Sequence, residues 1–291
     1  MGQTFEWEGR EVAGVQVRHP VSDTAALVML WANQYYQHNS LIMAYLQRLD
    51  LESGRSLFEH YNGICPWYSE VIINRKHFIS NTVKSMVNST RGKVTILNLG
   101  AGFSPLALEL SDLLTPNCLF IEIDENGMDQ KQALYPDLVP DRCGFISSIK
   151  ADITDGPSLE YALSHDNAGH LIVIMEGLTY YISREGMGGV LSNLSGIARE
   201  QSIVFEHLKP CRLIREERRS IPGRIFSHVR DYTALDRMTT YSEGEIRAIL
   251  PAGFTCSYYD MDEMEKRRTG ACTYFATPDS GWLSVSVAVR D

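Results

Sequence analysis

Hydrophobic positions along the chain follow two different patterns, and the change comes near residue 93. Before it, apolar residues recur three and four positions apart, most clearly over residues 68–87, which is typical of amphipathic helices. Ser22 and Asp23 form a helix-start signal, and a further helix is expected near 41–49. A short hairpin is expected at 4–18. The pattern therefore predicts a mainly helical N-terminal segment.

After residue 93, continuous apolar runs alternate with helical segments. The run VTILNL at 94–99 ends in glycines, as buried parallel strands often do. Further strands are expected at 118–124, 144–150, 170–176 and 202–207, with helices beginning at Ser104 and covering 158–163 and 184–199 between them. Five strands alternating with helices predict a doubly wound α/β sheet with right-handed crossovers.

The last third of the chain adds an insertion and two more strands. Residues 208–240 are basic and irregular, so we interpret them as a lid over the sheet. Ser242 and Glu245 predict a capped helix over 241–250, and strands are expected at 254–259 and 282–289. The predicted organisation is an N-terminal cap at 1–92 and a core at 93–291 that contains the lid insertion 208–240.

Composition narrows the possible functions. The formal net charge of −9 argues against a nucleic-acid partner held through phosphates. The longest apolar stretch, residues 25–32, is far shorter than the roughly 20 residues that cross a bilayer, and the N-terminus is polar. The six cysteines form no C-x-x-C pair and have no histidine at metal-ligand spacing. We expect a cytoplasmic, metal-free protein that acts on a small molecule; the oligomeric state stays open.

A glycine-rich junction is the strongest local signal for a ligand. Gly100, Ala101 and Gly102 follow the first predicted core strand, where glycines let a ligand approach the backbone. Asp124 ends the next strand, 22 residues after Gly102, where an acid can accept from both hydroxyls of a ribose. A dinucleotide fingerprint would need glycine at position 105, and Pro105 stands there. The pattern favours S-adenosylmethionine (SAM) over NAD.

Two later strand ends carry further candidates. Asp152 and Ile153 follow the third strand, where a carboxylate can accept from the adenine amino group and an apolar side chain can pack on the ring. Glu176 follows the fourth strand and precedes Tyr180 and Tyr181. Residues just past the carboxyl ends of parallel strands face the ligand crevice. We expect Glu176 and one of the tyrosines to contact cofactor or acceptor.

Taken in order, the segments GAGF, FIEID, KADITD and EGLTYYI, together with Ile73-Asn74-Arg75 upstream, resemble the leucine carboxyl methyltransferase-like family of class I SAM-dependent methyltransferases. That family includes polyketide-pathway O-methyltransferases and the carboxyl methylator of protein phosphatase catalytic subunits. The resemblance covers about residues 60–207. It implies a Rossmann-like sheet, mostly parallel with an antiparallel last strand, under a helical cap and a lid inserted after strand five.

The resemblance also implies roles for individual residues. Arg75 would pair with the methionine carboxylate, and Glu176 would hold the amino group. The remaining cofactor-binding candidates are Gly100, Ala101 and Gly102 at the floor, Glu122 and Asp124 in the FIEID strand, and Asp152 and Ile153 at adenine. The chain departs from the family at Ser104-Pro105-Leu106, where Asp-Thr-Arg is usual, and at Ser80, where a second arginine is usual.

The acceptor side offers fewer signals. Lid arginines could clamp an anionic acceptor, or they could form a solvated face paired with Glu216 and Glu217; they are Arg212, Arg215, Arg218, Arg219, Arg224 and Arg230. His207 and His228 are candidate general bases for a hydroxyl or amine, and the candidate catalytic contacts are Glu176 and Tyr181. A carboxylate acceptor would need no base.

The predicted function is O-methylation, at a carboxylate or hydroxyl, of a small natural-product-like molecule in secondary metabolism, with S-adenosylhomocysteine as the by-product. The alternatives are nitrogen or carbon methylation, transfer of another alkyl group, an NAD-dependent oxidoreductase, and a non-catalytic SAM-binding protein. Identifying the by-product and titrating a nicotinamide cofactor would separate them.

Overall fold

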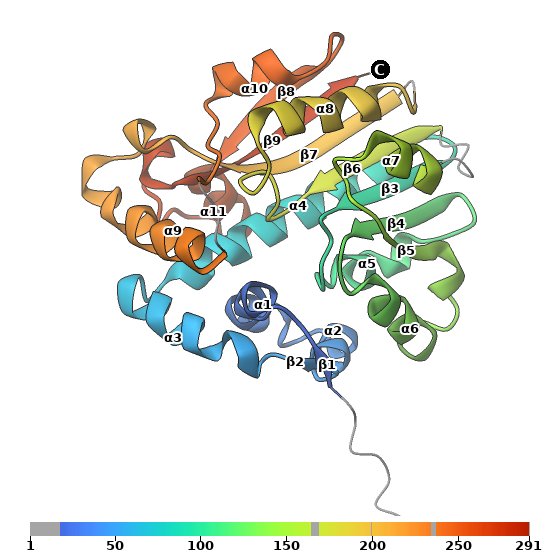
Figure 1. Ribbon diagram of the computed structural model, residues 1–291, viewed down its shortest axis with the longest axis horizontal. Helices are drawn as coiled ribbons and strands as arrows, with labels where there is room; N and C mark the ends of the chain where they lie inside the picture. The colour runs from blue at the N-terminus through green and yellow to red at the C-terminus, as the bar shows by residue number, and fades with distance from the viewer. Residues whose placement is uncertain (1–17, 164–168, 199, 234–236, 291) are drawn as a thin grey trace, which may run out of the picture.

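The computed structural model describes residues 18–163, 169–198, 200–233 and 237–290 (Figure 1). A seven-stranded sheet in the order β5-β4-β3-β6-β7-β9-β8 forms its centre. The strands are β3 Val94–Leu99, β4 Cys118–Asp124, β5 Ile146–Lys150, β6 His170–Met175, β7 Glu200–Leu208, β8 Thr255–Asp260 and β9 Leu283–Arg290. A separate short parallel pair joins β1 His19–Pro20 to β2 Leu49–Asp50.

Strand directions confirm the predicted fold class. The five strands from β5 to β7 are all parallel, and β9 is antiparallel to both β7 and β8. The chain leaves β3 toward β4 on one side and later returns to place β6 on the other side of β3. The strand order therefore reverses at β3, and in open α/β sheets ligands bind beyond the carboxyl ends of the strands at this point.

The continuous apolar strands are explained by helices on both faces of the sheet. Alternate residues of β3 enter different hydrophobic clusters: Ile96 packs with residues of the N-terminal helices, and Leu97 packs with Met187 and Leu191. The latter two belong to α8, Arg184–Ser195. With both faces covered, every position of β3 is buried, which is why the strand lacks the alternation of a half-exposed sheet.

Within residues 18–92, four α-helices form the cap: α1 Asp23–Tyr36, α2 Ser40–Leu46, α3 Arg55–Ile64 and α4 Tyr68–Ser89. Ser22 caps α1 as expected, accepting from the Ala25 N–H. Helix α3 was not predicted. The cap and one face of the sheet share a single hydrophobic cluster, in which Phe78 and Ile79 of α4 pack with the sheet residues. The hairpin expected at 4–18 lies outside the described residues apart from position 18.

The lid is more regular than its sequence suggests. After two short 3₁₀ turns at Cys211–Leu213 and Glu216–Arg218, residues Ser220–Thr233 form helix α9, which packs on α3 (Figure 1). Its buried positions Ile225 and Val229 stand one turn apart. The prediction of an irregular segment was wrong because the apolar stripe is short and separated by arginines.

The remaining helices are α5 Leu106–Glu109, α6 Met128–Leu138, α7 Gly156–Leu163, α10 Glu243–Ile249 and α11 Met261–Thr269. The predicted capping box at Ser242 and Glu245 is present. Helix α5 is a single turn, shorter than expected, and α11, which packs on α4, was not predicted. In the described part of the chain, no helix combines the length and the hydropathy that a membrane span requires.

Candidate cofactor and acceptor site

Two adjoining cavities lie beyond the carboxyl ends of β3, β4 and β6. The outer cavity, about 620 Å³, is lined by Asp124, Asp152 and Ile153 among others. The inner cavity, about 370 Å³, extends beneath the cap and is lined by Arg75 and Glu176 among others. Four residues line both: Gly100, Asp124, Leu178 and Tyr181. This is the position at which the reversed strand order predicts a ligand.

The glycine loop shapes the boundary between the cavities. Gly100 has a φ of +65°, and a Cβ there would lie 2.7 Å from Cδ1 of Leu178. Gly102 has a φ of +44°, and its N–H donates to Oδ2 of Asp124 at 2.9 Å. The Asn126 N–H donates to Oδ1 of the same carboxylate at 3.0 Å. These two N–H groups hold the Asp124 carboxylate at the mouth that both cavities share. The positive φ at Gly100 and Gly102 favours glycine at both positions.

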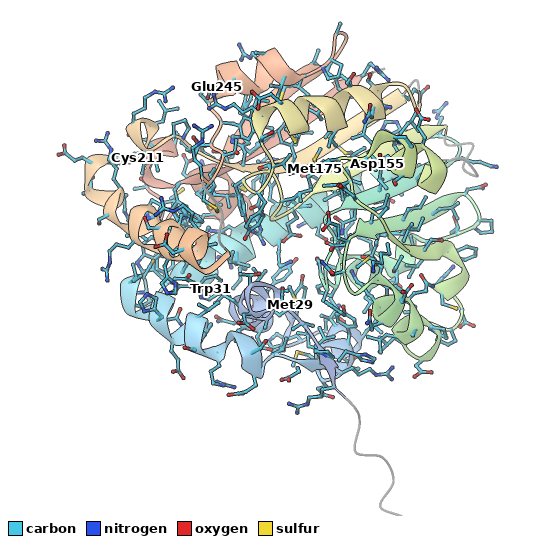
Figure 2. All side chains as sticks on the ribbon, in the orientation of Figure 1. Met29, Trp31, Asp155, Met175, Cys211 and Glu245 are labelled. Carbon is cyan, nitrogen blue, oxygen red and sulfur yellow. The ribbon has the colours of Figure 1, made fainter. Side chains whose placement is uncertain are left out.

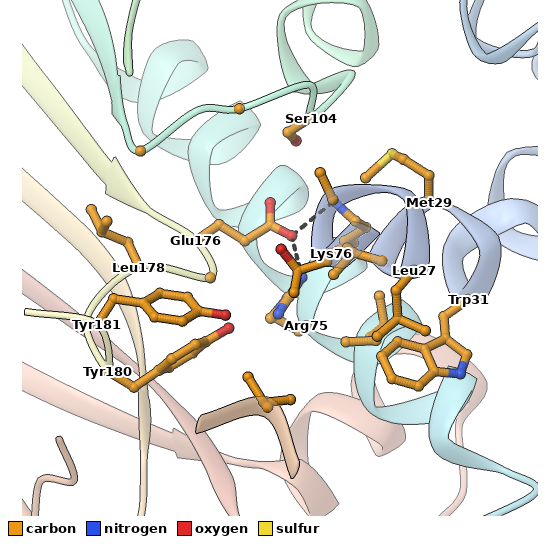
Figure 3. Close-up of a pocket in the computed structure, with 18 of the residues that line it drawn as sticks. Leu27, Met29, Trp31, Arg75, Lys76, Ser104, Glu176, Leu178, Tyr180 and Tyr181 are labelled. Carbon is orange, nitrogen blue, oxygen red and sulfur yellow. Dashed lines mark hydrogen bonds and ion pairs between the residues drawn. The ribbon is translucent and has the colours of Figure 1, made fainter. Parts of the chain in front are cut away.

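Two cations and two carboxylates meet behind this loop. Arg75 contacts Oε1 of Glu176 at 2.7 Å through Nη2 and Oε2 of Glu206 at 2.8 Å through Nη1. Lys76 Nζ lies 2.8 Å from the same Oε1 of Glu176 (Figure 3). Helix α4 supplies both cations, Glu176 follows β6, and Glu206 lies in β7. We call these four side chains the charge cluster.

The two carboxylates have opposite pKa shifts. Burial alone would raise the pKa of Glu176, but attraction by Lys76 and Arg75 outweighs it and lowers the pKa to about 2. Burial raises the pKa of Glu206 to about 7, because Arg75 compensates only in part and Glu176 repels its charge. Glu176 is therefore an anion at every physiological pH, whereas Glu206 gains or loses its proton near neutrality.

Two residues that line the inner cavity, Arg75 of the charge cluster and Ser104, have unmet hydrogen-bonding capacity. Within the described residues, neither Nε of Arg75 nor the hydroxyl of Ser104 finds a partner, although both atoms are buried. Ser104 lines the inner cavity, as do Glu176 and Lys76 (Figure 3). Buried polar atoms without partners are costly, so a polar ligand that satisfies them would be favoured here.

The rest of the inner cavity is apolar and aromatic. Helix α1 contributes Leu27, Val28, Met29 and Trp31, and α9 contributes Ile225, Phe226 and Val229. Met29 and Trp31 are marked in Figures 2 and 3. Tyr180 and Tyr181 lie side by side, with ring centroids 4.6 Å apart, and in the close-up Arg75 stands between them and the α1 residues Leu27 and Trp31 (Figure 3). Burial raises the pKa of Tyr181 to about 12 and that of Tyr180 further. Both phenols are neutral at physiological pH and can donate hydrogen bonds.

The family model of leucine carboxyl methyltransferase matches residues 18–195. The chain belongs to the leucine carboxyl methyltransferase family. The resemblance seen in the sequence is thereby confirmed, and with it, at the level of family and fold, the expected class of SAM-dependent methyltransferases.

More distant similarities agree with this assignment. The tRNA wybutosine-synthesizing protein 4 of Candida glabrata is 25% identical over 221 residues, which are 62% of this chain and 31% of that protein. The solved structure of the CurJ carbon methyltransferase has a TM-score of 0.52 and 14% identity, covering 92% of this chain and 67% of the other. A possible exported protein from Bordetella parapertussis has a TM-score of 0.50 and 14% identity, covering 92% and 97%. At this identity the structures support the fold alone.

Most of the residues predicted for the family's cofactor site come together. Those that line the inner cavity are Arg75, Gly100, Ala101, Gly102, Asp124, Glu176 and Tyr181, and those that line the outer cavity include Asp152 and Ile153. Asp152 is pre-ordered by its neighbour, because its Oδ1 accepts from the Thr154 N–H at 2.8 Å and from the Thr154 hydroxyl at 2.7 Å.

Glu122 does not reach the site, and its prediction as a cofactor ligand is corrected. The carboxylate is fully buried and contacts Nζ of Lys131 at 2.6 Å, the hydroxyl of Tyr135 at 2.5 Å and the hydroxyl of Ser148 at 3.1 Å. It lines neither cavity. Its oxygens are already occupied by partners from α6 and β5, so its role in this arrangement is structural.

The two histidines proposed as bases also lie elsewhere. His207 follows Glu206 in β7, so it faces the opposite side of the sheet, where its Nε2 lies 3.0 Å from the Ser286 hydroxyl. Burial lowers the pKa of His207 to about 3. In α9, His228 turns toward α3, with Nδ1 2.8 Å from the Tyr61 hydroxyl and its ring 4.7 Å from that of His60. Neither histidine lines the inner or the outer cavity.

The predicted arginine clamp is not found at the inner or the outer cavity. Arg218 donates to the Tyr274 carbonyl and stacks over Trp67, and Arg215 pairs with Glu217 at 2.8 Å. None of the six lid arginines lines the inner or the outer cavity. The Arg215–Glu217 contact matches the alternative of a surface face paired with lid glutamates.

Sequence reasoning missed two members of the charge cluster. Lys76 follows Arg75 directly, and neighbouring helix positions point about 100° apart, so the sequence did not indicate that both reach one carboxylate. Glu206 lies in a strand that the sequence pattern predicts to be buried, and it was not among the predicted site residues. A charged residue at a buried strand position was the available signal, because buried charges need partners.

Proposed function

We propose that this chain transfers a methyl group from SAM to an oxygen of a small molecule, and that a carboxylate is the preferred acceptor. The observation that carries the proposal is the charge cluster, of which Arg75, Lys76 and Glu176 line the inner cavity that adjoins the outer one. Its two cations and two carboxylates suit the methionine end of SAM, which is itself a zwitterion. Membership in a methyltransferase family supports the same assignment.

The cavity-lining residues suggest how the cofactor is held. Asp152 and Ile153 would contact adenine, and Asp124 would accept from the ribose hydroxyls. Glu176 would receive the ammonium group, while Arg75 and Lys76 would face the carboxylate. Ser104 would add a hydrogen bond that the family usually obtains from other residues. When bound, SAM supplies an electrophilic methyl group whose transfer to oxygen leaves the C–S electron pair on sulfur and releases S-adenosylhomocysteine.

A carboxylate acceptor fits the chemistry of the inner cavity. A hydroxyl or ammonium acceptor needs a base, and no histidine is among the described residues that line this cavity. Glu176, with a pKa of about 2, binds a proton too weakly to serve as one. A carboxylate is already ionised, and the neutral phenols of Tyr180 and Tyr181 could orient it by donating hydrogen bonds. The apolar walls from α1 and α9 would hold a hydrocarbon body and exclude water.

A natural-product-like acceptor in secondary metabolism and a cytoplasmic location stay predictions from the sequence. The apolar cavity favours a small acceptor over a polymer, and nothing in the site favours nicotinamide chemistry or transfer of another alkyl group.

The deciding experiment uses methyl-labelled SAM and matched panels of aliphatic acids, phenols and amines. We expect label in a base-labile ester and S-adenosylhomocysteine as the by-product. A base-stable methylated product would contradict the carboxylate assignment. Cofactor binding without turnover across all three panels would favour the non-catalytic alternative.

A further inference from the structure

A third cavity, which we call the lid cavity, lies between the lid, the end of β7 and the start of β9. Its volume is about 250 Å³. It is lined by Leu208, Lys209, Cys211, Ile214, Arg219, Pro222, Gly223, Phe226, Ser227, Arg230, Arg237, Met238, Thr240 and Trp282. Of these residues, Cys211 is labelled on the lid in Figure 2. Nothing in the proposed cofactor site uses this space.

The lining has an unusual charge composition. It contains four cations, Lys209, Arg219, Arg230 and Arg237, and no carboxylate, in a chain whose acids outnumber its bases by 36 to 27. Lys209 pairs with Asp260 and Arg230 with Asp231. Carbonyl oxygens hold Arg219 instead: its Nε donates to Ile214 at 2.8 Å and its Nη2 to Arg212 at 3.4 Å. Carbonyl partners orient a guanidinium without cancelling its charge, so the cavity attracts anions.

The lid cavity adjoins the inner cavity. Leu208 and Phe226 line both, so two apolar side chains form the partition between them. Phe226 is half-buried and lies on α9, whose other face packs on α3. An elongated molecule that reached from the apolar part of the inner cavity to the lid cavity would therefore meet apolar side chains at the partition.

We propose that the lid cavity binds an anionic group at the far end of an elongated apolar acceptor whose near end is methylated in the inner cavity. The inference rests on the proposed function and specifies its substrate class: an amphipathic molecule with a reactive carboxylate at one end, a hydrocarbon body, and a second anion at the other end. Apolar walls with a few placed cations are the usual composition of sites for such ligands.

The test compares straight-chain α,ω-dicarboxylates of 8 to 16 carbons with monocarboxylates of equal length. Dissociation constants are measured by calorimetry on the full chain saturated with S-adenosylhomocysteine. We expect at least one dicarboxylate to bind about tenfold more tightly than its monocarboxylate, the difference expected for one charge-assisted contact. The preference should weaken as salt is raised, because the cations lie near the surface.

Variants locate the second anion. Arg219→Gln should abolish the preference while monocarboxylates bind as before, and the matched control Arg224→Gln, an exposed lid arginine outside all three cavities, should keep it. Gly223→Phe should also abolish it by filling the lid cavity, since a Cβ at Gly223 meets no atom within 4 Å. This second variant tests occupancy without removing the hydrogen bonds of Arg219.

The outcomes separate the two proposals. If monocarboxylates bind and no dicarboxylate binds better at any length, the lid-cavity inference is wrong and the proposed function stands. A preference that survives both Arg219→Gln and Gly223→Phe would place the second anion elsewhere and also overturn the inference. If S-adenosylhomocysteine binds but no carboxylate of either series does, the carboxylate assignment itself fails, and the inference fails with it.

Discussion

Replacing Asp124 by asparagine removes one charge at the mouth shared by the inner and outer cavities. The aspartate accepts two backbone N–H groups, one on each oxygen, from Gly102 at 2.9 Å and Asn126 at 3.0 Å. Asparagine has a single oxygen, so one of these N–H groups would face an NH₂ donor. The same substitution would replace a charged acceptor for the two ribose hydroxyls with a neutral group.

Charge-assisted hydrogen bonds contribute about 1.5–3 kcal/mol each, and neutral ones about 1 kcal/mol. Weakening two such bonds should cost about 3 kcal/mol of binding free energy, which raises Kd about 100-fold. The lost backbone contact should lower the free energy of unfolding by about 1–2 kcal/mol as well, but this loss is present with and without ligand.

Calorimetric titration with S-adenosylhomocysteine measures the effect, with unfolding curves on the same samples to establish that the variant is folded. The matched control is Asp129→Asn, an exposed acid in the first turn of α6 outside the cavities, which should bind as the parent does. A Kd for Asp124→Asn within about twofold of the parent would refute the ribose assignment, because a change that small is below the contribution of one hydrogen bond.

Three further outcomes are expected. The pKa of Glu206 rises from 4.5 to about 7 on folding, so its stabilising contribution is complete below pH 4.5 and about 3 kcal/mol is lost as pH rises through 7. In urea titrations, Glu206→Gln should therefore make the free energy of unfolding depend less on pH between pH 5 and 8. An unchanged pH dependence would contradict the pKa shift. His207→Asn and His228→Gln should each keep kcat/KM within about threefold, whereas losing a general base costs about 100-fold or more. Gly100→Ala should destabilise the fold by about 1–2 kcal/mol because of its positive φ, as measured by thermal unfolding, while Gly144→Ala, whose Cβ meets no atom within 4 Å, should change it little.

Much of the fold could be predicted because its signals are local. Strands β3, β4 and β6 are covered on both faces and therefore form predominantly apolar runs that need no tertiary information to recognise. The capping box at Ser242 and Glu245 is likewise contained within four residues. Helices α9 and α11 were missed because their apolar stripes are short and their stability depends on packing against α3 and α4.

Some residues of the site could likewise be predicted from local sequence signals, whereas others could not. Gly100, Gly102, Asp124, Asp152 and Glu176 could be assigned from the sequence because each lies at the end of a predicted parallel strand, and such ends converge at one edge of a sheet. Once the order and direction of the strands are known, a residue at the carboxyl end of a strand is known to reach the crevice.

Tertiary structure alone decided which side chains fill that crevice. Glu122 and Asp124 share a strand and a face, yet Lys131, Tyr135 and Ser148 bind the first carboxylate and leave the second at the cavity mouth. The charge cluster unites cations from α4 with one carboxylate just after β6 and one in β7, about 100 residues or more away along the chain. The sequence by itself determined the sheet and its ligand edge because periodicity and strand ends are local properties; partners, burial and pKa depend on contacts between distant segments, which only the folded chain brings together.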